Sequence, residues 1–401
     1  MAGSNTQQNL RTTLTSRPPE PQLGRNHITF VCNDTKTLYL FRREVIIELV
    51  RANYQVTIVA PFDEYVEYFI AEGVQFHQLT LSRQGRNVLE DYRSYQSLRR
   101  AYKNLKPDII FHYTIKVNIY GTLAASKLGI PSISVVPGLG HFPDADNRLF
   151  KALLAKGYEK AARNSTEIWF LNSHDHGYFE AKGWLEKTNC RILPGEGINT
   201  RTFYYKAPLR NKVPSVLYLG RLLINKGART FAQAAKRSKR LGINATFKMV
   251  GFIDESHSNG IKTKELNSWT KKGWITYGGS TNSPQSVLEQ SDIIVVPTNY
   301  REGLNRVIQE ALAIGRPVIT TAVPGAGELV EHNKTGYIVP PNNPNAIVDV
   351  LQLFLSYSRE KQEKMGQLGS RSVSEKYDVN NVLPHYWDAI ARHCKVSNIS
   401  Q

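Results

Sequence analysis

Two loops in the second half of the chain have the residue types and spacing of a diphosphate site. The apolar run 215–219 leads into Gly220-Arg221, and Asn225-Lys226-Gly227 follows just before a segment expected to be helical. Glycine lets a ligand approach the backbone, a helix N-terminus attracts an anion, and arginine and lysine add positive charge. We therefore expect Gly220, Arg221 and Lys226 to hold a diphosphate, although the Walker spacing GxxxxGKS/T is absent.

Three further apolar runs end on residues that suit other parts of a ligand. Gly251 follows one run, and Tyr277-Gly278-Gly279 ends another, where a flat group such as a base can lie. The segment 297–310, PTNYREGLNRVIQE, turns from a strand end into a helix, with Glu302 in the turn and Glu310 about two helical turns further on. Paired carboxylates can accept hydrogen bonds from sugar hydroxyls. Alternatively, Glu302 could be a helix-capping residue and Glu310 an ordinary surface glutamate. The diphosphate-type loops upstream make this alternative less convincing.

The first half has two loops with similar features. The segment 111–121, FHYTIKVNIYG, puts His112, Lys116 and Asn118 at a strand end and helix start. The segment 136–144, VPGLGHFPD, has Gly138 and Gly140 for a tight turn, and it is not a dinucleotide fingerprint because proline stands at the third glycine position. For His112, a hydrogen-bonded histidine inside the strand end is as good an interpretation as a catalytic one.

The elements that must position these residues follow from an alternation of short apolar runs with helical segments. This alternation predicts an α/β fold with two Rossmann-like parallel-sheet domains. The ligand loops of each domain are expected at the carboxyl ends of its strands, and the two sets of loops are expected to face each other. We expect an N-terminal arm over 1–25, domains over 26–207 and 208–376, and a C-terminal helix within 377–401 that crosses back to the first domain. The expected strands are 27–33, 55–60, 108–112, 132–136, 167–171, 215–219, 245–250, 275–277, 293–296, 318–320 and 337–339.

Composition limits the function classes. The chain has 401 residues, a formal charge of +17 and 41% apolar residues, and it contains no run of about 18 apolar residues that would span a membrane. Its three cysteines lie far apart, which argues against disulfides and structural zinc. The positive charge leaves a nucleic-acid or membrane-surface binder as an alternative, but that function leaves the glycine and glutamate loops unexplained.

Other clusters have simpler interpretations. The segment 147–163 predicts a basic amphipathic helix, with Leu149, Phe150, Leu153 and Leu154 flanked by Arg148, Lys151 and Lys156. Such a helix can lie on an anionic bilayer, or it can pack on the core with a solvated basic face. We interpret Asp144-Ala145-Asp146 as a loop and capping feature and His174-Asp175-His176 as a helix start, because the histidine cluster lacks further ligands at fitting spacing.

The combined motifs resemble a known family. Glu302 and Glu310 form an E-x7-E pair, preceded by the GR and NKG loops and by Gly197-Ile198-Asn199 with Phe203 at the domain joint. Over nearly all of residues 27–395 the chain is similar to the retaining nucleotide-sugar glycosyltransferases of family 4, which have the GT-B fold. The resemblance implies donor diphosphate binding by Arg221 and Lys226, the ribose on Glu310, and the sugar on Glu302. It further implies phosphate and sugar contacts from the amides of Gly303, Leu304 and Asn305, a base near Tyr277–Gly279, and neither cofactor nor metal.

The first-half loops look like those of bacterial enzymes that extend polyprenyl-diphosphate-linked sugars. This similarity implies a UDP-N-acetylhexosamine donor, with galactose, glucose or a uronic acid left open, and a lipid-diphosphate glycan as acceptor. It implies acceptor contacts from Arg42, Lys116, Asn118, Gly138 and Gly140, no nucleic-acid partner, and work at the inner face of the bacterial cytoplasmic membrane. Leu304-Asn305-Arg306 departs from the apolar or small residues of relatives, and Arg306 can meet a donor carboxylate. A sugar-nucleotide 2-epimerase shares the architecture, but its motifs are not evident.

Overall fold

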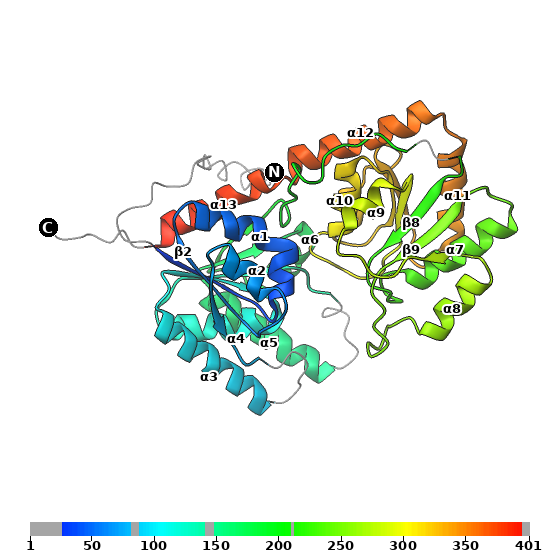
Figure 1. The fold of residues 1–401 in the computed structure, drawn as a ribbon. Coiled ribbons are helices and arrows are strands. Elements are labelled where there is room, and N and C mark those ends of the chain that lie inside the picture. The colour runs from blue at the N-terminus through cyan, green and yellow to red at the C-terminus, as the bar shows by residue number, and fades with distance from the viewer. Residues whose placement is uncertain (1–25, 82–87, 141–147, 210–211, 395–401) are drawn as a thin grey trace, which may run out of the picture.

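The apolar runs of the first half form one parallel sheet. The computed structural model describes residues 26–81, 88–140, 148–209 and 212–394. Seven strands pair in the order β3-β2-β1-β4-β5-β6-β7, all parallel. The central strands are buried along their whole length because helices cover both faces of the sheet (Figure 1), as is typical of parallel sheets. The strands are β1 (His27–Val31), β2 (Gln55–Ala60), β3 (Gln75–Gln78), β4 (Ile109–Tyr113), β5 (Ser132–Val136), β6 (Glu167–Phe170) and β7 (Asn189–Ile192).

Helices connect these strands, and their starts carry recognisable caps. The Asp34 side chain accepts the Thr37 N–H at the start of the first helix, which therefore begins at Thr35. Asn172 caps the sixth helix in the same way, by accepting the Asp175 N–H. The helices of this domain are α1 (Thr35–Arg51), α2 (Val66–Ala71), α3 (Val88–Leu105), α4 (Ile115–Lys127), α5 (Arg148–Asn164) and α6 (Ser173–Ala181).

The second half repeats the design with a six-stranded parallel sheet. Its order is β10-β9-β8-β11-β12-β13, so the predicted fold class, two Rossmann-like parallel-sheet domains, is confirmed. The strands are β8 (Ser215–Leu219), β9 (Thr246–Val250), β10 (Thr276–Tyr277), β11 (Ile293–Val296), β12 (Val318–Thr321) and β13 (Gly336–Val339). The helices are α7 (Ala228–Arg240), α8 (Thr263–Lys271), α9 (Pro284–Glu289), α10 (Arg306–Ile314), the short 3₁₀ helix η2 (Gly327–Leu329), α11 (Pro344–Ser356) and α12 (Arg359–Lys376).

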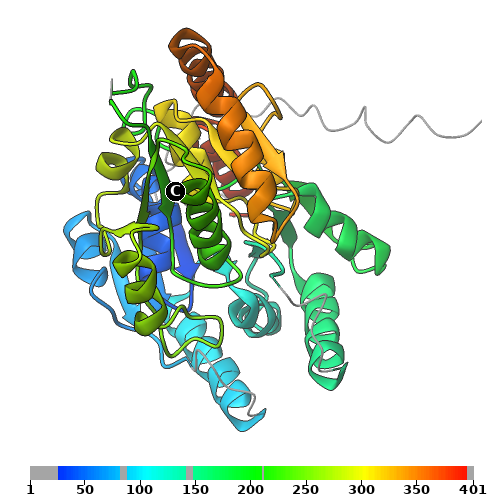
Figure 2. The same cartoon turned by 90° about the vertical axis from the view of Figure 1, so that its right-hand side faces the viewer.

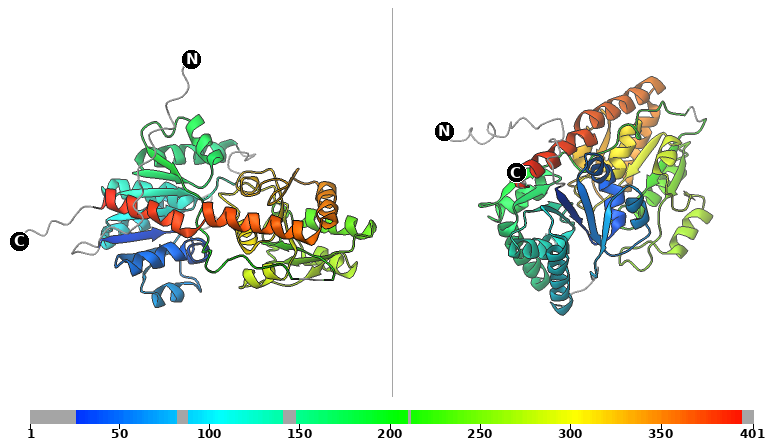
Figure 3. Two further views of the ribbon diagram at one scale, coloured as in Figure 1. Left: turned by 90° about the horizontal axis from the view of Figure 1, so that it is seen from above. Right: turned by 60° about the vertical axis from the view of Figure 1, so that its left-hand side comes forward.

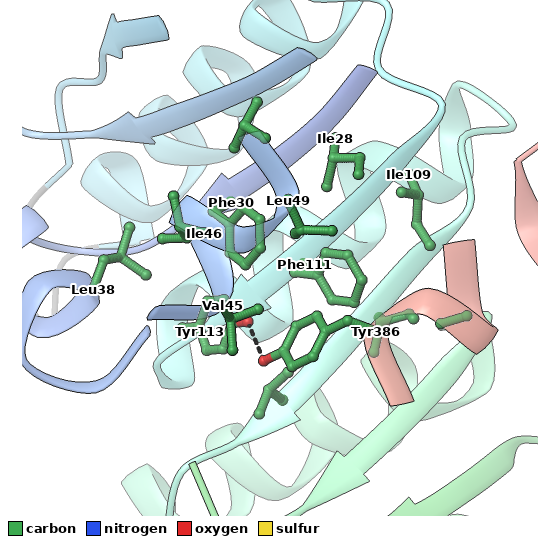
Figure 4. Close-up of a cluster of buried hydrophobic side chains, with 14 of the residues drawn as sticks. Ile28, Phe30, Leu38, Val45, Ile46, Leu49, Ile109, Phe111, Tyr113 and Tyr386 are labelled. Carbon is green, nitrogen blue, oxygen red and sulfur yellow. Dashed lines mark hydrogen bonds between the residues drawn. The ribbon is translucent and has the colours of Figure 1, made fainter. Parts of the chain in front are cut away.

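Two long helices near the C-terminus join the domains. Figure 3 shows α12 and then α13 (Val379–His393) running in succession across both domains. The Ser370 hydroxyl of α12 donates to the Ala313 carbonyl of α10 at 2.7 Å, which places α12 on the second domain. Tyr386 of α13 enters the core of the first domain, where its hydroxyl lies 2.9 Å from that of Tyr113 (Figure 4). The last helix therefore completes the first domain.

Candidate active site between the two domains

The loop between β8 and α7 carries the predicted diphosphate residues. Gly227 ends it with a φ of 84°, and a Cβ atom there would lie 2.1 Å from the Pro297 carbonyl oxygen, so only glycine fits. The Asn299 N–H and the Thr298 hydroxyl both donate to the Asn225 carbonyl, at 2.9 and 3.2 Å. These contacts hold the loop where the strand order switches from β8 to β11, the place at which doubly wound sheets bind ligands.

Lys226 and Glu302, predicted to serve one ligand, form an ion pair. The Lys226 Nζ lies 2.5 Å from the Glu302 Oε1 and 4.7 Å from the centre of the Tyr300 ring, and the Asn305 amide donates to the same carboxylate oxygen at 3.0 Å. Burial lowers the pKa of Lys226, the Glu302 carboxylate opposes that effect, and the positive charge of Arg221 lowers the pKa further. The junction therefore combines a largely desolvated ammonium group with an exposed guanidinium, an arrangement suited to stabilising an anion.

The predicted base-binding residues pack on one another at three strand ends. A Cβ atom on Gly251 would lie 1.7 Å from the Gly220 carbonyl oxygen, so glycine at 251 permits the close approach of the β8 and β9 loops. The Tyr277 hydroxyl donates to the Gly251 carbonyl at 2.9 Å, and the Gly278 N–H donates to the Met249 carbonyl at 2.9 Å. These residues form one continuous surface at the carboxyl edge of the sheet.

Two of the three amides predicted to bind phosphate and sugar are engaged within the protein. The Gly303 N–H donates to the Pro137 carbonyl of the first domain at 2.9 Å, and the Asn305 N–H donates to the Gly325 carbonyl at 2.7 Å. The Asn305 side chain instead caps α10 by accepting the Ile308 N–H at 3.1 Å. In this conformation the amides of Gly303 and Asn305 are therefore not available to a donor, which corrects that prediction. Leu304 packs beside Gly195, where an added Cβ would lie 2.9 Å from its Cδ1.

Glu310 lies buried in α10 and is paired with the arginine one turn earlier. The Arg306 Nε donates to the Glu310 Oε1 at 2.9 Å, and its Nη1 donates to the Gly197 carbonyl at 2.9 Å. Burial raises the pKa of Glu310, the positive charges of Arg306 and Arg43 oppose that rise, and Glu44 adds to it. Arg306 is thus engaged with Glu310 and with the joint between the domains. The expectation that it meets a donor carboxylate is not supported in this conformation.

Gly138 and Gly140 bring the first domain against the predicted donor segment. A Cβ atom on Gly138 would lie 2.6 Å from the Gly303 nitrogen, and one on Gly140 would lie 2.4 Å from the Tyr300 hydroxyl. The residue types that predicted a tight loop therefore also permit this close contact between the domains. The predicted acceptor loop after β5 and the predicted donor loop after β11 meet directly.

Asn172, which the sequence analysis did not single out, bridges the same junction. Its Nδ2 donates to the carbonyls of Glu302 and Gly303, both at 3.0 Å. The residue follows β6 after a single intervening residue and stands just before α6. The rule that polar residues at strand carboxyl ends form the site would have found it, had it been applied to this strand.

His112 does not reach the junction, which corrects the catalytic prediction. The side chain is fully buried, with its Nε2 2.9 Å from the Tyr102 hydroxyl and its Nδ1 3.2 Å from the Thr122 hydroxyl. Burial lowers the pKa of His112 to about 3, so the ring is neutral at physiological pH. The alternative interpretation, a hydrogen-bonded histidine inside a strand end, describes this residue.

Two of the predicted acceptor residues are also structural. Arg42 is buried, donates to Glu196 at 2.8 Å and lies 4.5 Å from the centre of the Tyr113 ring. Asn118 is fully buried and donates to the Val135 carbonyl at 2.8 Å. Neither side chain can contact an acceptor in this conformation, because each is enclosed and engaged inside the first domain. Lys116 differs: it lies in the first turn of α4 with its Nζ 2.9 Å from Asp91, and it is partly exposed.

The remaining clusters show no metal chemistry in the part of the chain that the structure describes. Within it, no group of three or more His, Cys, Asp or Glu side chains could hold a metal ion. His174-Asp175-His176 lies at the start of α6, where the Asp175 carboxylate accepts the Asn172 amide at 2.9 Å. The Asp144–Asp146 triad, the 1–25 arm and the side chains of residues 148–150 lie outside the described residues.

The basic helix is present as α5, and Leu153 on it is 60% exposed. Leu154 is half-buried and Lys156 is exposed. Among the described residues, no helix combines the length and the apolar character that crossing a bilayer requires.

Comparison with known proteins finds a matching family model for each half of the chain. The family model "Glycosyl transferase 4-like" matches residues 27–170, and the model "Glycosyl transferases group 1" matches residues 201–371. The N,N'-diacetylbacillosaminyl-diphospho-undecaprenol alpha-1,3-N-acetylgalactosaminyltransferase of Campylobacter jejuni is 26% identical over 90% of this chain and 96% of its own. The UDP-Gal:alpha-D-GlcNAc-diphosphoundecaprenol alpha-1,3-galactosyltransferase of Escherichia coli is 25% identical over 66% of this chain and 70% of its own.

Solved structures share the fold at low sequence identity. HepE of Anabaena in complex with UDP and glucose superposes with a TM-score of 0.74 at 14% identity, over 91% of this chain and 99% of its own. Sucrose-phosphate synthase from Thermosynechococcus elongatus gives a TM-score of 0.73 at 17% identity, over 92% of this chain and 99% of its own. These two likenesses agree with the GT-B architecture and concern the fold alone.

Proposed function

This chain is a glycosyltransferase, with a 4-like first domain and a group 1 second domain, and from that premise we propose that it uses a UDP-sugar and a polyprenyl-diphosphate-linked saccharide. The sugar moved is an N-acetylhexosamine such as N-acetylgalactosamine, and its anomeric configuration is retained. The observation that carries the proposal is the junction of Lys226 and Glu302 with exposed Arg221 beside the N-terminus of α7. The activity named for the Campylobacter jejuni relative, which aligns along most of its length, supports the choice of substrates.

The chemistry of transfer fits the residues at the junction. The bond between the anomeric carbon and the UDP oxygen breaks, and Arg221, Lys226 and the positive end of the α7 helix dipole stabilise the negative charge that grows on the diphosphate. The acceptor hydroxyl attacks from the same face, and its proton passes to the departing phosphate oxygen. No protein nucleophile is needed. Contacts between the domains exclude water and so limit hydrolysis of the donor.

Two carboxylates would orient the donor. Glu302 and Lys226 are paired in this conformation, so an arriving diphosphate draws Lys226 partly away and leaves Glu302 to accept sugar hydroxyls. Glu310 would accept from the ribose, and the positive charge of Arg306 opposes the rise that burial causes in the pKa of Glu310. We expect no metal ion in this step, because the basic side chains supply the charge that a metal would otherwise supply.

The acceptor would come to the first domain from a membrane. Lys116, at the start of α4, is the partly exposed cation among the predicted acceptor contacts. A lipid-linked acceptor would bring the protein to the inner face of the cytoplasmic membrane, where the basic helix α5 adds attraction to anionic lipids. UDP-galactose is the second candidate donor, because the name of the Escherichia coli relative specifies it.

Thermal stability with nucleotides tests the donor site. We expect UDP to raise the melting temperature more than GDP or ADP, and Arg221→Ala to abolish the effect, because a ligand at 100 times its dissociation constant adds about 2.7 kcal/mol of stability. Arg240→Ala, an exposed arginine at the far end of α7, is the matched control and should retain the response. A chain that no nucleotide stabilises, or one in which both variants respond alike, would contradict this donor site.

A further inference from the structure

A side chain of the first domain reaches across the junction to the Glu302 turn, residues 301–304. Asn172 follows β6 and is buried, and its Nδ2 donates to the carbonyls of Glu302 and Gly303, both at 3.0 Å. Figure 2 looks onto the second domain, behind which the first domain lies, so these bonds join parts of the molecule that face each other. The first domain therefore contacts the turn that carries the carboxylate expected to bind the donor sugar.

One peptide unit of the Glu302 turn is held by the first domain on both sides. Its N–H, from Gly303, donates to the Pro137 carbonyl at 2.9 Å, and its carbonyl, from Glu302, accepts from Asn172. The Glu302 N–H adds a longer bond, of 3.3 Å, to the Pro324 carbonyl of the second domain. Because residues 301–304 lie outside helices and strands, no ladder of hydrogen bonds fixes their main chain, and the contacts with the first domain set its position.

The carboxylate of Glu302 is held by the other domain. Lys226 lies 2.5 Å from it, and the Asn305 amide donates to it at 3.0 Å. The main chain and the side chain of one residue are thus fixed by different domains. Since an arriving diphosphate would draw Lys226 away, the position of the main chain then determines where the freed carboxylate lies.

Asp175 fixes which way the Asn172 amide points. Its N–H donates to the Asn172 Oδ1 at 2.8 Å, and its carboxylate accepts from the Nδ2 at 2.9 Å. With both ends of the amide engaged, the NH2 group faces the two carbonyls of the Glu302 turn. The Asp175 side chain is 1% exposed, and burying a carboxylate costs free energy that capping a helix at the surface does not require.

Capping α6 does not require the NH2 group of Asn172. A cap residue uses a side-chain oxygen to accept an N–H of the first turn, and serine does so about as well as asparagine. Asn343 caps α11 in this way, because its Oδ1 accepts the N–H groups of Asn345 and Ala346 at 3.1 and 3.0 Å. The two bonds from Asn172 to the Glu302 turn are therefore separable from its role as a cap.

We propose that Asn172 is a positioning residue for sugar transfer, whose NH2 group holds the Glu302 turn where its carboxylate meets the donor sugar. The proposal rests on the proposed function and adds the residue of the first domain that sets the position of Glu302. Asn172 acts through the main chain of Glu302 and needs no contact with either substrate. A misplacement of about 1 Å at a reacting centre can lower the rate about 10²-fold.

The variant that separates the two roles of Asn172 is Asn172→Ser, because the serine hydroxyl can cap α6 but carries no group at the position of the Nδ2. We expect kcat for sugar transfer to fall at least tenfold while the stabilisation by UDP stays unchanged, since Arg221 and Lys226 remain in place. Asn343→Ser is the matched control, the same substitution at a cap of the second domain, and it should keep the wild-type kcat.

Hydrogen exchange tests the contact without any turnover. The Gly303 N–H, which donates to the Pro137 carbonyl, reports directly on the Glu302 turn. In the full chain without ligands, we expect the Gly303 amide to exchange at least tenfold faster in Asn172→Ser than in the wild type, as measured by mass spectrometry of overlapping peptides. In Asn343→Ser this amide should exchange at the wild-type rate.

The outcomes separate the positioning role from the proposed function. A wild-type kcat in Asn172→Ser overturns the proposal whatever the exchange rate, because the bridge would then be a domain contact that the reaction does not need. A lower kcat with wild-type exchange overturns it too, because the loss would not come from the Glu302 turn. If the wild type turns over no UDP-sugar, the proposed function fails, whereas faster exchange in Asn172→Ser still shows that Asn172 holds the turn.

Discussion

Lys226 interacts with both the Glu302 carboxylate and the Tyr300 ring in this conformation. Its ammonium pairs with Glu302 at 2.5 Å and lies over the Tyr300 ring, and burial lowers its pKa. Removing a preorganised charge that stabilises a leaving group typically costs a factor of about 10² to 10³ in rate. We therefore expect Lys226→Ala to lower kcat by about that factor in assays of sugar transfer.

The control for this substitution is Lys264→Ala, at an exposed lysine of α8. It should keep the wild-type rate, and melting curves should show that both variants fold. A Lys226→Ala variant that retains full kcat would remove this side chain from the mechanism.

The pairing of Arg306 with buried Glu310 predicts a pH effect. Burial raises the pKa of Glu310 and the Arg306 charge opposes the rise, so without Arg306 the pKa rises further. Arg43 and Glu44 of α1 also act on this carboxyl, with opposite signs. If the charged form binds the donor, the acid limb of kcat/KM for the UDP-sugar should move to higher pH in Arg306→Ala and less in Arg306→Lys.

A loss that is uniform across pH would instead assign Arg306 a purely structural role through the Gly197 carbonyl. Activity of Arg306→Ala should recover toward the wild-type value as pH increases, because Glu310 then ionises. Glu310→Gln should show no such acid limb.

At the residue scale, residues that the sequence analysis brought together lie near each other in space, while their binding of a ligand stays a prediction. Lys226 and Glu302 were expected to serve one ligand, and the structure brings them together. The catalytic interpretation of His112 and the acceptor contact of Arg42 were wrong, because His112 is enclosed by Tyr102 of the preceding helix and Arg42 is paired with Glu196, 154 residues away in the chain. The Arg306–Gly197 contact depends on packing between segments far apart in the chain, whereas Asn172 follows a strand end and the strand-end rule could have found it.

At the scale of elements, the two strands that the sequence analysis did not predict are short edge strands. β3 (QFHQ) and β7 (NCRI) each have four residues, exposed at both ends. The sequence signal of a buried strand is a continuous apolar run, and an edge strand with one covered face does not need one. Most of the eleven expected strands are buried apolar runs, whereas the two-residue edge strand β10 was expected from the run that leads into Tyr277-Gly278-Gly279.

The last helix is held to the first domain by a buried carboxylate. Glu167 of β6 accepts from Trp169 at 2.9 Å and contacts His393 and Arg392 of α13 at 2.6 and 2.7 Å. Burial would raise the pKa of Glu167, but the hydrogen bonds from His393 and Trp169 and the charges of Arg191 and Arg392 outweigh it and lower the pKa to about 2. Glu167 is 1% exposed, so this contribution is little screened.

Because the folded pKa is lowered, the stabilisation from Glu167 is present above its unfolded pKa and is lost as pH falls toward about 2. The shift corresponds to roughly 3 kcal/mol in full, of which about 1 kcal/mol is lost between pH 7 and pH 4. Urea unfolding should show a smaller pH 7 to pH 4 difference in Glu167→Gln. Glu159→Gln, at a surface pair with Arg163, should keep the wild-type difference.

At the scale of the whole molecule, hydrogen bonds and close packing hold the two domains together at the candidate active site. Gly303 donates to Pro137, Asn172 bridges two carbonyls of the donor segment, and Gly138 leaves room for Gly303. The predicted donor residues belong to the second domain, whereas the predicted acceptor loops belong to the first. Binding of donor and transfer to acceptor can therefore be separated by loosening this junction.

Gly138→Ala is the substitution that should separate donor binding from transfer to the acceptor. Its Cβ would lie 2.6 Å from the Gly303 nitrogen at a φ of 123°, so the junction must open or the loop must shift. We expect transfer to fall at least tenfold while UDP still stabilises the protein, because Arg221 and Lys226 remain in place. Gly129→Ala is the matched control: it has a φ of 66° and nothing within 4 Å of an added Cβ, so it tests backbone strain without the contact. If both substitutions reduce transfer equally, close approach of the domains is not what the reaction requires; if only Gly138→Ala does so, the junction itself assembles the active site.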